Sequence, residues 1–203
     1  MGDLRIHELQ DFKYNFNLDT FIETGTFHGD GVAHALNYFD TIHSIEIDKE
    51  LAQDAIERFK DNPGVHIHLG TSVEVLELLL PNIDGNILFW LDAHFPGADA
   101  HKVRYDNEPD MDIRAPLSRE LELISQLRPN KKDVMIIDDL WMYEDGPFAW
   151  GSFDSHAKKC NLDINLETIM KGATLDSFYA AHEDTHNFTK RYEHQGYLIV
   201  TPK

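Results

Sequence analysis

The sequence predicts an α/β fold of the doubly wound type, with a mostly parallel sheet, helices on both faces and a C-terminal antiparallel hairpin. Short apolar runs alternate with segments of helical period, which is typical of parallel strands buried between helices. The last two apolar runs are separated only by a glycine turn, which favours a hairpin. With 203 residues, of which 42% are hydrophobic, the chain fits a single domain over residues 1–203.

The predicted parallel strands are short apolar runs, most of them bounded by Gly, Asn or Asp. They cover residues 20–23, 41–46, 66–69, 87–91 and 133–137. Because helices lie between consecutive strands, the connections are expected to be right-handed crossovers, which give a parallel sheet. Trp90 lies inside one of these runs, so we expect it to pack in the core.

The first predicted helix follows the second strand and covers residues 49–59. Its residues Leu51, Ala55 and Phe59 lie on one stripe, and Asp48 is placed to cap its N-terminus. This helix therefore has one face to bury against the sheet.

Two further helices have clear boundary signals. Thr71 and Glu74 have the spacing of a capping box, which predicts a helix over residues 71–80. Pro116 begins another helix and Pro129 ends it. The inward positions of that helix are Leu117, Leu121 and Ile124.

The C-terminal region departs from the strand and helix alternation. A helix is predicted around residues 162–170, and two strands over residues 187–194 and 197–203 are joined by Gln195 and Gly196. This hairpin is expected to insert one antiparallel strand into the sheet. The long irregular regions, 93–115 and 142–161, follow two strand ends, where ligands bind in open α/β sheets.

The charge of the chain excludes several partners. The 36 acidic and 18 basic residues give a formal net charge of −18, which repels nucleic acid and anionic membranes. The N-terminal residues carry charges throughout, and the apolar runs fall far short of the roughly 20 residues of a membrane-spanning helix. We therefore expect a cytoplasmic protein that binds neither nucleic acid nor membranes, with Cys160 as a lone structural thiol.

A glycine-rich loop follows the first predicted strand. Residues 21–31 read F-I-E-T-G-T-F-H-G-D-G, with glycines at Gly25, Gly29 and Gly31. This order is the reverse of the G-x-G-x-x-G pattern that binds dinucleotides. The loop therefore indicates a different ligand, unless it serves only as a tight turn.

Two acids near the loop indicate which ligand. Glu46 ends the second predicted strand, 46 − 25 = 21 residues after Gly25, where an acid typically accepts hydrogen bonds from ribose hydroxyls. Glu23 lies immediately before the loop, and its charge opposes a pyrophosphate but suits a cation with a free amino group. A ribose joined to such a cation describes S-adenosylmethionine.

The segments E-T-G-T-F-H-G-D-G, S-I-E-I-D and L-G-T-S together resemble the class I S-adenosylmethionine-dependent methyltransferases, which have a Rossmann-like fold. The resemblance covers about residues 18–140. It implies that the backbone around Gly25 and Gly31 approaches the methionine part, that Glu46 holds the ribose, and that Ile47 lies near the adenine. The cofactor-binding residues that it implies are Glu23, Thr24, Gly25, Thr26, Phe27, Gly29, Gly31, Glu46, Ile47, Gly70, Thr71, Ser72 and Asp92. Thr71 and Asp48 also fit a purely structural role as helix caps.

Acids follow the next two predicted strands. Asp92 and His94 come after one strand, and Asp138 and Asp139 come after its expected neighbour. Three carboxylates at one point suit Mg²⁺ or Ca²⁺, and such an ion lowers the pKa of a bound hydroxyl. The alternative is that Asp138 and Asp139 only cap a solvated turn.

This second pattern resembles the metal-dependent O-methyltransferases of the catechol and macrocin types. The resemblance implies Asp92, Asp138 and Asp139 as metal ligands. Phe95 stands where the catechol type has a catalytic lysine. His94 is the local substitute as a base, so His94 and Asp92 are the catalytic candidates, although His94 could instead only orient Asp92 or contact the substrate.

For Glu120 the sequence leaves two alternatives, an outer metal ligand or, more simply, a residue that faces water. The substrate is expected to meet polar side chains of loop 93–115 and an aromatic wall after the fifth strand. The polar residues are His101, Lys102, Arg104, Tyr105 and Arg114, and the aromatic residues are Trp141, Tyr143, Phe148 and Trp150. Both sets suit a sugar or a phenol.

The sequence thus favours a methyltransferase that uses S-adenosylmethionine and a divalent metal to O-methylate a hydroxylated small molecule. A homodimer is a possible assembly. The alternatives are a metal-independent methyltransferase, a nucleotide-sugar-modifying or nucleotide-binding protein without methyl transfer, and a binding module without catalysis. A dehydrogenase or dehydratase would need the forward glycine spacing and a Tyr-x-x-x-Lys pair, and the sequence has neither.

Overall fold

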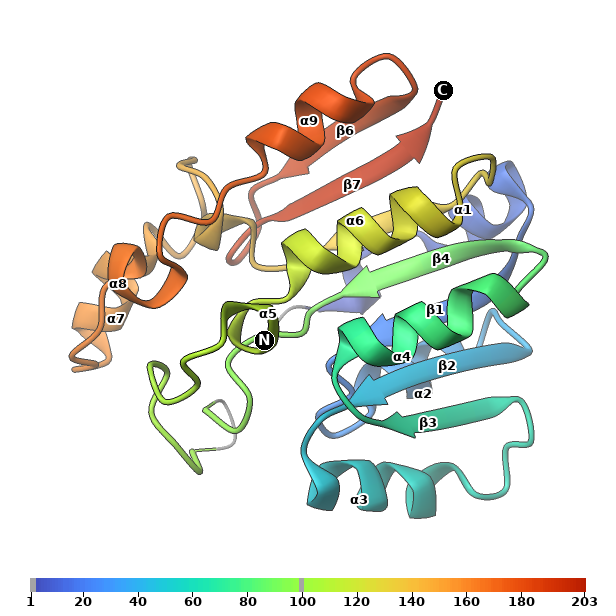
Figure 1. The fold of residues 1–203 in the computed structure, drawn as a ribbon, viewed down its shortest axis with the longest axis horizontal. Coiled ribbons are helices and arrows are strands. Elements are labelled where there is room, and N and C mark those ends of the chain that lie inside the picture. Colours follow the sequence, from blue (N-terminus) through green and yellow to red (C-terminus); the bar gives the residue numbers. More distant parts are fainter. Residues whose placement is uncertain (1–2, 99–100) are drawn as a thin grey trace.

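The computed structural model describes residues 3–98 and 101–203, and within them all strands form one sheet in the order β3-β2-β1-β4-β5-β7-β6 (Figure 1). The first five strands pair in parallel, and β7 lies antiparallel between β5 and β6. The strands are β1 (Leu18–Thr24), β2 (Thr41–Glu46), β3 (Val65–Leu69), β4 (Asn86–Leu91), β5 (Val134–Ile137), β6 (His186–Arg191) and β7 (Tyr197–Pro202). The predicted fold class, including the C-terminal hairpin, is confirmed.

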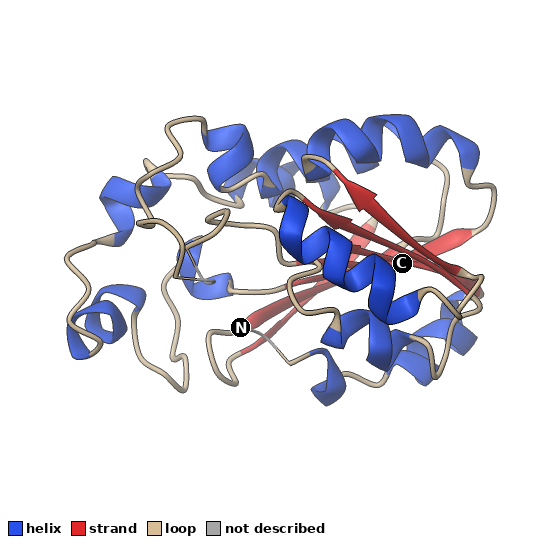
Figure 2. Ribbon diagram, turned by 90° about the horizontal axis from the view of Figure 1, so that it is seen from below, coloured by secondary structure: helices blue, strands red, loops and turns tan. Residues whose placement is uncertain are grey.

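Helices cover both faces of this sheet (Figure 2). They are α1 (Leu9–Phe16), α2 (Asp30–Ala35), α3 (Lys49–Phe59), α4 (Ser72–Leu79), α5 (Met111–Arg114), α6 (Leu117–Leu127), α7 (Phe153–Lys159), α8 (Leu166–Met170) and α9 (Asp176–His182). Short 3-10 helices lie at Leu4–Ile6, Leu80–Asn82 and Leu140–Met142. Among the residues that the structure describes, no helix combines the length and the apolar character needed to cross a membrane.

Alternation along the parallel strands supplies two separate cores. On β4, Phe89 belongs to the core that includes Leu76 of α4 and Leu121 of α6. Its neighbour Trp90 belongs to the core on the other face, with Val32 of α2. Successive strand residues point to opposite faces, so a strand that is covered on both sides is apolar throughout.

The predicted helix boundaries are confirmed where a cap was recognised. The Asp48 side chain accepts from the N–H groups of Glu50 and Leu51 at the start of α3. The Thr71 side chain accepts from the Glu74 N–H at the start of α4. The predicted inward residues of α6, Leu117, Leu121 and Ile124, are all buried.

The structure also contains helices that the sequence did not predict. These are α1, α2, α7 and α9, together with α5 inside the region expected to be irregular. The helix predicted around residues 162–170 covers only Leu166–Met170. Figure 1 shows that α5, α7, α8 and the loops around them extend beyond the carboxyl ends of the parallel strands. They therefore surround the edge of the sheet where a ligand would bind.

Candidate active site

A pocket opens at the carboxyl ends of the parallel strands, beside β1 and β4. The order of the sheet reverses between these two strands, and such switch points are the usual ligand sites of open α/β sheets. Of the residues predicted to act here, the pocket is lined by Gly25, Phe27, Glu46, Ile47, Gly70, Thr71, Ser72, Asp92 and His94. The remaining wall comes from both ends of loop 93–115 and from Ile45, Leu51 and Pro116.

At two positions of the loop, neighbouring atoms lie so close to the backbone that glycine is required. Gly25 has φ +85°, and a Cβ at this position would lie 2.8 Å from the carbonyl oxygen of Asp92. A Cβ on Gly31 would overlap Oε1 of Glu23. Gly29 has a structural role instead, because it precedes α2 with φ +78° and packs against the ring of Phe59.

Glu46 is held rigidly at the end of β2. One carboxylate oxygen accepts from the Phe27 N–H at 2.8 Å, and the other accepts from the Asp48 N–H at 2.8 Å. Burial raises the pKa of Glu46, and these backbone hydrogen bonds oppose the rise. A carboxylate fixed in this way on a pocket wall can accept hydrogen bonds from two adjacent hydroxyls, such as those of a ribose.

Glu23 lies off the main pocket, in a second hollow beside it. That hollow also contains Arg5, Asp30 and Trp90, and it shares Gly25, Phe27 and Asp92 with the main pocket. Ser44 donates to Glu23 at 2.7 Å, and the hydroxyls of Ser44 and Thr26 are 2.6 Å apart. Burial raises the pKa of Glu23 to about 8, despite the opposing hydrogen bond from Ser44. Near neutral pH this acid is therefore largely protonated unless a cation enters the hollow.

Thr24 connects the ends of β1 and β4. Its carbonyl oxygen and its side-chain hydroxyl accept from the Asp92 N–H at 3.2 and 3.3 Å. Thr24 is fully buried and does not line the pocket. It therefore supports Asp92 rather than facing the ligand.

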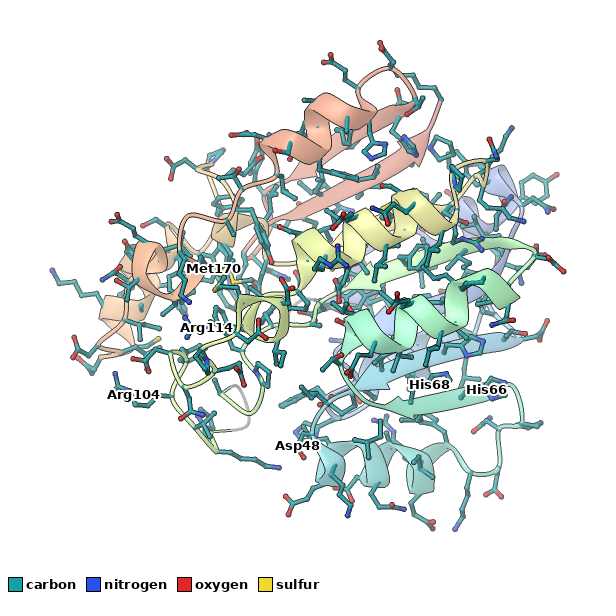
Figure 3. All side chains as sticks on the ribbon, viewed as in Figure 1. Asp48, His66, His68, Arg104, Arg114 and Met170 are labelled. Atoms are coloured by element: carbon teal, nitrogen blue, oxygen red, sulfur yellow. The ribbon has the colours of Figure 1, made fainter. Side chains whose placement is uncertain are left out.

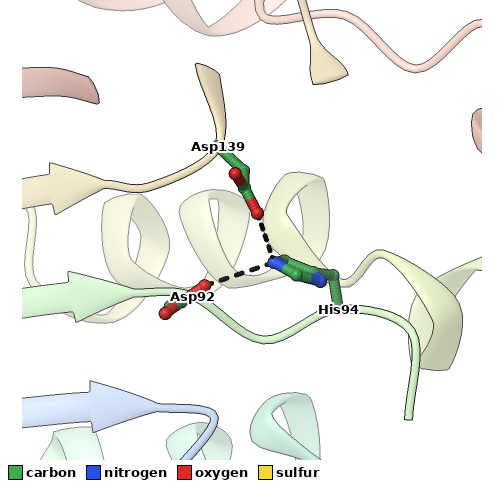
Figure 4. A group of neighbouring side chains, drawn as sticks. All are labelled: Asp92, His94 and Asp139. Atoms are coloured by element: carbon green, nitrogen blue, oxygen red, sulfur yellow. Dashed lines mark ion pairs between the residues drawn. The ribbon is translucent and has the colours of Figure 1, made fainter. Parts of the chain in front are cut away.

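Asp92, His94 and Asp139 form a compact group at the ends of β4 and β5 (Figure 4). Nε2 of His94 lies 3.2 Å from Asp92 Oδ1 and 2.8 Å from Asp139 Oδ2. One ligand atom from each residue lies within 4.8 Å of the other two. Burial raises the pKa of Asp92, and His94 opposes that rise. Two carboxylates and an imidazole in this arrangement fit either one shared proton or one divalent cation.

Asp138 is absent from this group, in contrast to the three carboxylates expected from the sequence. It is 2% exposed, and its oxygens have no hydrogen-bond partner among the described residues. Its pKa is raised well above the ordinary value by burial and then by Asp92 and Asp139. Burial raises the pKa of Tyr197, a residue of the Trp90 core, and the charge of Asp138 adds to the rise. Asp138 directly follows β5, whereas Asp139 has a left-handed φ of +53°.

Glu120 does not face water, and that expectation was wrong. It is 1% exposed on the buried side of α6, and burial raises its pKa to about 7, while Ser72 and Thr24 oppose the rise. The sequence signal that was missed is the spacing of Glu120. It lies three residues after Leu117 and four before Ile124, so it falls on the apolar stripe of the helix.

The expected aromatic wall is also wrong. Trp141, Tyr143 and Phe148 are buried in the core on the α4 and α6 side. Trp150 is 39% exposed and stacks on His156. In the described chain, none of the four lines the pocket. The acids of the site nevertheless affect Tyr143. Burial and the charges of Glu120 and Asp139 raise its pKa well above its usual range.

The polar residues of loop 93–115 mainly organise the loop itself. The guanidinium of Arg114 donates to the carbonyl oxygens of Glu108, Asp106 and Ile169, which ties the loop to α8 near Met170 (Figure 3). Arg104 pairs with Asp106 at 3.0 Å, and Tyr105 packs against Phe95. His101 is exposed.

Lys102 links loop 93–115 to the start of α3. Its ammonium lies 2.7 Å from Asp48 Oδ2 and 2.9 Å from Glu50 Oε2, at the start of α3. Pro96 and Gly97 of the same loop line one wall, and Ile47 and Leu51 line the other. These ion pairs therefore hold the loop against the opposite side of the pocket.

Comparisons with known proteins agree with the fold. No protein-family model matches the chain, and no curated protein matches it. Solved structures do match over 98–100% of the chain, at 12–14% identity. A caffeoyl-CoA O-methyltransferase-like protein from Staphylococcus aureus has a TM-score of 0.61 at 12% identity, with 85% of that chain covered. A Podospora anserina methyltransferase with SAH bound has a TM-score of 0.60 at 12% identity, with 80% covered.

A SAM-dependent methyltransferase from Anabaena variabilis has a TM-score of 0.55 at 14% identity, with 98% of this chain and 84% of that chain covered. At these identities the likeness concerns the fold. The chain therefore has the Rossmann-like fold of class I methyltransferases.

Proposed function

We propose that this protein is an S-adenosylmethionine-dependent methyltransferase. The observation that carries the proposal is Glu46, a carboxylate fixed by two backbone N–H groups on the wall of a pocket at the switch point of the sheet. A dinucleotide-binding loop would present its glycines in the opposite order. The solved structures with this fold include methyltransferases, one of them with SAH bound.

In this proposal the cofactor extends along the pocket from Ser72 to Asp92. Glu46 accepts the ribose hydroxyls, while Ile47 and Thr71 flank the adenine. The methionine part reaches Gly25, where the main pocket meets the hollow of Glu23. A cationic amino group there would favour the ionised form of Glu23, because an opposite charge lowers the pKa of a carboxyl group.

The proposed reaction is O-methylation of a small hydroxylated molecule such as a sugar or a phenol. The hydroxyl oxygen attacks the methyl carbon, the bond from that carbon to sulfur breaks, and the sulfonium becomes a neutral thioether. The hydroxyl proton passes to a base, and when no cation occupies the group His94 is placed for this role between Asp92 and Asp139. The buried wall at Phe95 gives the acceptor an apolar surface.

A divalent cation fits the same group. Asp92, His94 and Asp139 would hold it, and when bound it would lower the pKa of the acceptor hydroxyl. Carboxylates suit Mg²⁺ and Ca²⁺, whereas the imidazole shifts the preference toward Mn²⁺ or another transition metal. The second candidate is a metal-independent methyltransferase in which no cation binds and His94 accepts the hydroxyl proton. Activity that survives chelation and is not raised by Mg²⁺ or Mn²⁺ would favour this second candidate.

Calorimetry tests the cofactor assignment directly. The wild type is expected to bind S-adenosylmethionine and not NAD. Glu46→Gln should weaken binding about tenfold or more, because a hydrogen bond to a charged group is lost. Glu57→Gln, an exposed acid on α3, is the matched control. Binding of NAD with none of S-adenosylmethionine would refute the proposal. A screen of hydroxylated sugars and phenols with radiolabelled cofactor then identifies the acceptor class.

A further inference from the structure

Three histidines lie together on β2 and β3, away from the proposed active site. His66 and His68 are two residues apart on β3, so their side chains point to the same face of the sheet. His43 on β2 is the direct register partner of His66. Figure 3 shows His66 and His68 on β3, the strand at the edge of the sheet. Strand geometry alone therefore gathers three imidazoles.

The rings are close enough to share one ion. Nδ1 of His43 and Nε2 of His68 are 3.0 Å apart. Two imidazole nitrogens bound to one tetrahedral Zn²⁺, at 2.0–2.1 Å each, lie about 3.3–3.4 Å from each other. The His43 ring also stacks on His66, with ring centres 4.9 Å apart and planes at 22°. His66 is exposed, so its ring can rotate toward the pair.

The protonation state of the cluster also suits a metal. Burial and the neighbouring histidines lower the pKa of His43 to about 4, and burial followed by His66 lowers that of His68. Neutral imidazole is the form that binds metals. The half-buried position of His43 and His68 leaves access from the exposed side, at His66.

We propose that His43, His66 and His68 form a site for Zn²⁺ or a similar borderline transition-metal cation. Three histidines with one open position are a recognised zinc ligand set. The ion would join the edge strand β3 to β2, the strand that ends at Glu46. It would thus stabilise the part of the sheet next to the proposed ribose wall, and it does not depend on the proposed methyl transfer.

The test is a Zn²⁺ titration by calorimetry on untagged, chelator-treated protein. We expect His43→Asn/His68→Asn to lose one equivalent of Zn²⁺ relative to the wild type. The milder His66→Asn should weaken that equivalent roughly tenfold. Asp139→Asn, which alters the other candidate metal group, should retain it. Wild-type stoichiometry and affinity in His43→Asn/His68→Asn would overturn the proposal.

A measurement on the wild type covers the case in which the double variant fails to fold. One equivalent of Zn²⁺ should shift the ring NMR signals of His43, His66 and His68 together, while the exposed His101 stays unchanged. Zn²⁺ should also raise the melting temperature, because it binds only the folded strands. Ring signals of the three histidines that do not move would likewise overturn the proposal.

Discussion

Gly31 has no side chain, and this leaves room for the buried carboxyl group of Glu23. It lies in the first turn of α2, where a Cβ would overlap Oε1 of Glu23. Alanine normally stabilises a helix relative to glycine by up to about 1 kcal/mol. At this position we predict the opposite sign, with Gly31→Ala lowering the free energy of unfolding by about 1–3 kcal/mol through overpacking. Urea unfolding measures the change.

A double-mutant cycle identifies the contact responsible. In a Glu23→Ala background the space is free, so Gly31→Ala should cost much less or should stabilise α2. Equal costs in both backgrounds would mean that the contact with Glu23 is not the cause.

Glu23 also predicts how stability depends on pH. Its pKa in the folded protein, about 8, lies above the ordinary 4.5, so the folded state binds more protons between these values. Stability should therefore fall as the pH rises from about 4.5 to 8. The pKa of Glu120, about 7, acts in the same direction. Unfolding midpoints of wild type and Glu23→Gln at several pH values check this. The variant should show a shallower slope, and identical slopes would contradict the assignment.

At the scale of elements, Arg128 and Asp133 join the end of α6 to two strands. Their side chains are 1% and 5% exposed and pair at 2.6 Å. Arg128 also donates to the carbonyl oxygens of Ile83 and Gly85, and Asp133 accepts from the Ile87 N–H. These interactions fix the start of β4 relative to β5. They thereby fix the positions at which both strands end in the proposed site.

Removing Arg128 should lower the stability of the fold strongly. Arg128→Ala leaves a buried carboxylate without its partner, and we predict a loss of about 3–5 kcal/mol in the free energy of unfolding. Arg119→Ala is the matched control on the same helix, because its ion pair with Glu122 is exposed and should contribute about 0–1 kcal/mol. Chemical denaturation compares the two variants, and similar losses would contradict the prediction.

Lys102 connects loop 93–115 to the start of α3 through ion pairs with Asp48, whose side chain is 18% exposed, and with Glu50, whose side chain is 83% exposed. Such pairs are individually weak, so the loop can open. We predict that Lys102→Ala speeds release of bound S-adenosylmethionine about two- to fivefold, measured by stopped-flow fluorescence. Lys60→Ala removes a comparable exposed pair with Glu57 outside the pocket and should leave the release rate unchanged. An unaltered rate in Lys102→Ala would show that the loop does not retain the cofactor.

At the scale of the whole molecule, the elements that could be predicted from the sequence were those set by local sequence patterns. Apolar runs located the parallel strands, and Asp48 and Thr71 located two helix starts. The helices α1, α2, α7 and α9 were missed because each is short and buries few residues, so no clear period marks them. The aromatic residues after β5 were misplaced because the sequence does not show that the chain folds back over the core.

The candidate site followed the same rule. Gly25, Glu46, Asp92 and His94, which the sequence places at or after strand ends, line one pocket. The direction of each side chain beyond the strand end could not be read in this way. Strand alternation places Asp138 on the side of the Trp90 core, whereas Asp139 has a left-handed backbone and its carboxylate lies 2.8 Å from Nε2 of His94. Adjacent acids in the sequence thus lie in different environments.

This separation allows a decisive comparison between Asp138 and Asp139. Asp139→Asn should weaken Mn²⁺ binding roughly tenfold or more, since one ligand of the proposed site loses its charge. Asp138→Asn should bind Mn²⁺ as the wild type does, because its carboxylate lies outside the group and its raised pKa already favours the neutral form. Calorimetry with Mn²⁺ measures both variants, and unchanged binding of S-adenosylmethionine shows that each is folded. Equal losses in the two variants would instead support the three carboxylates expected from the sequence, and would require Asp138 to turn toward His94 when a cation binds.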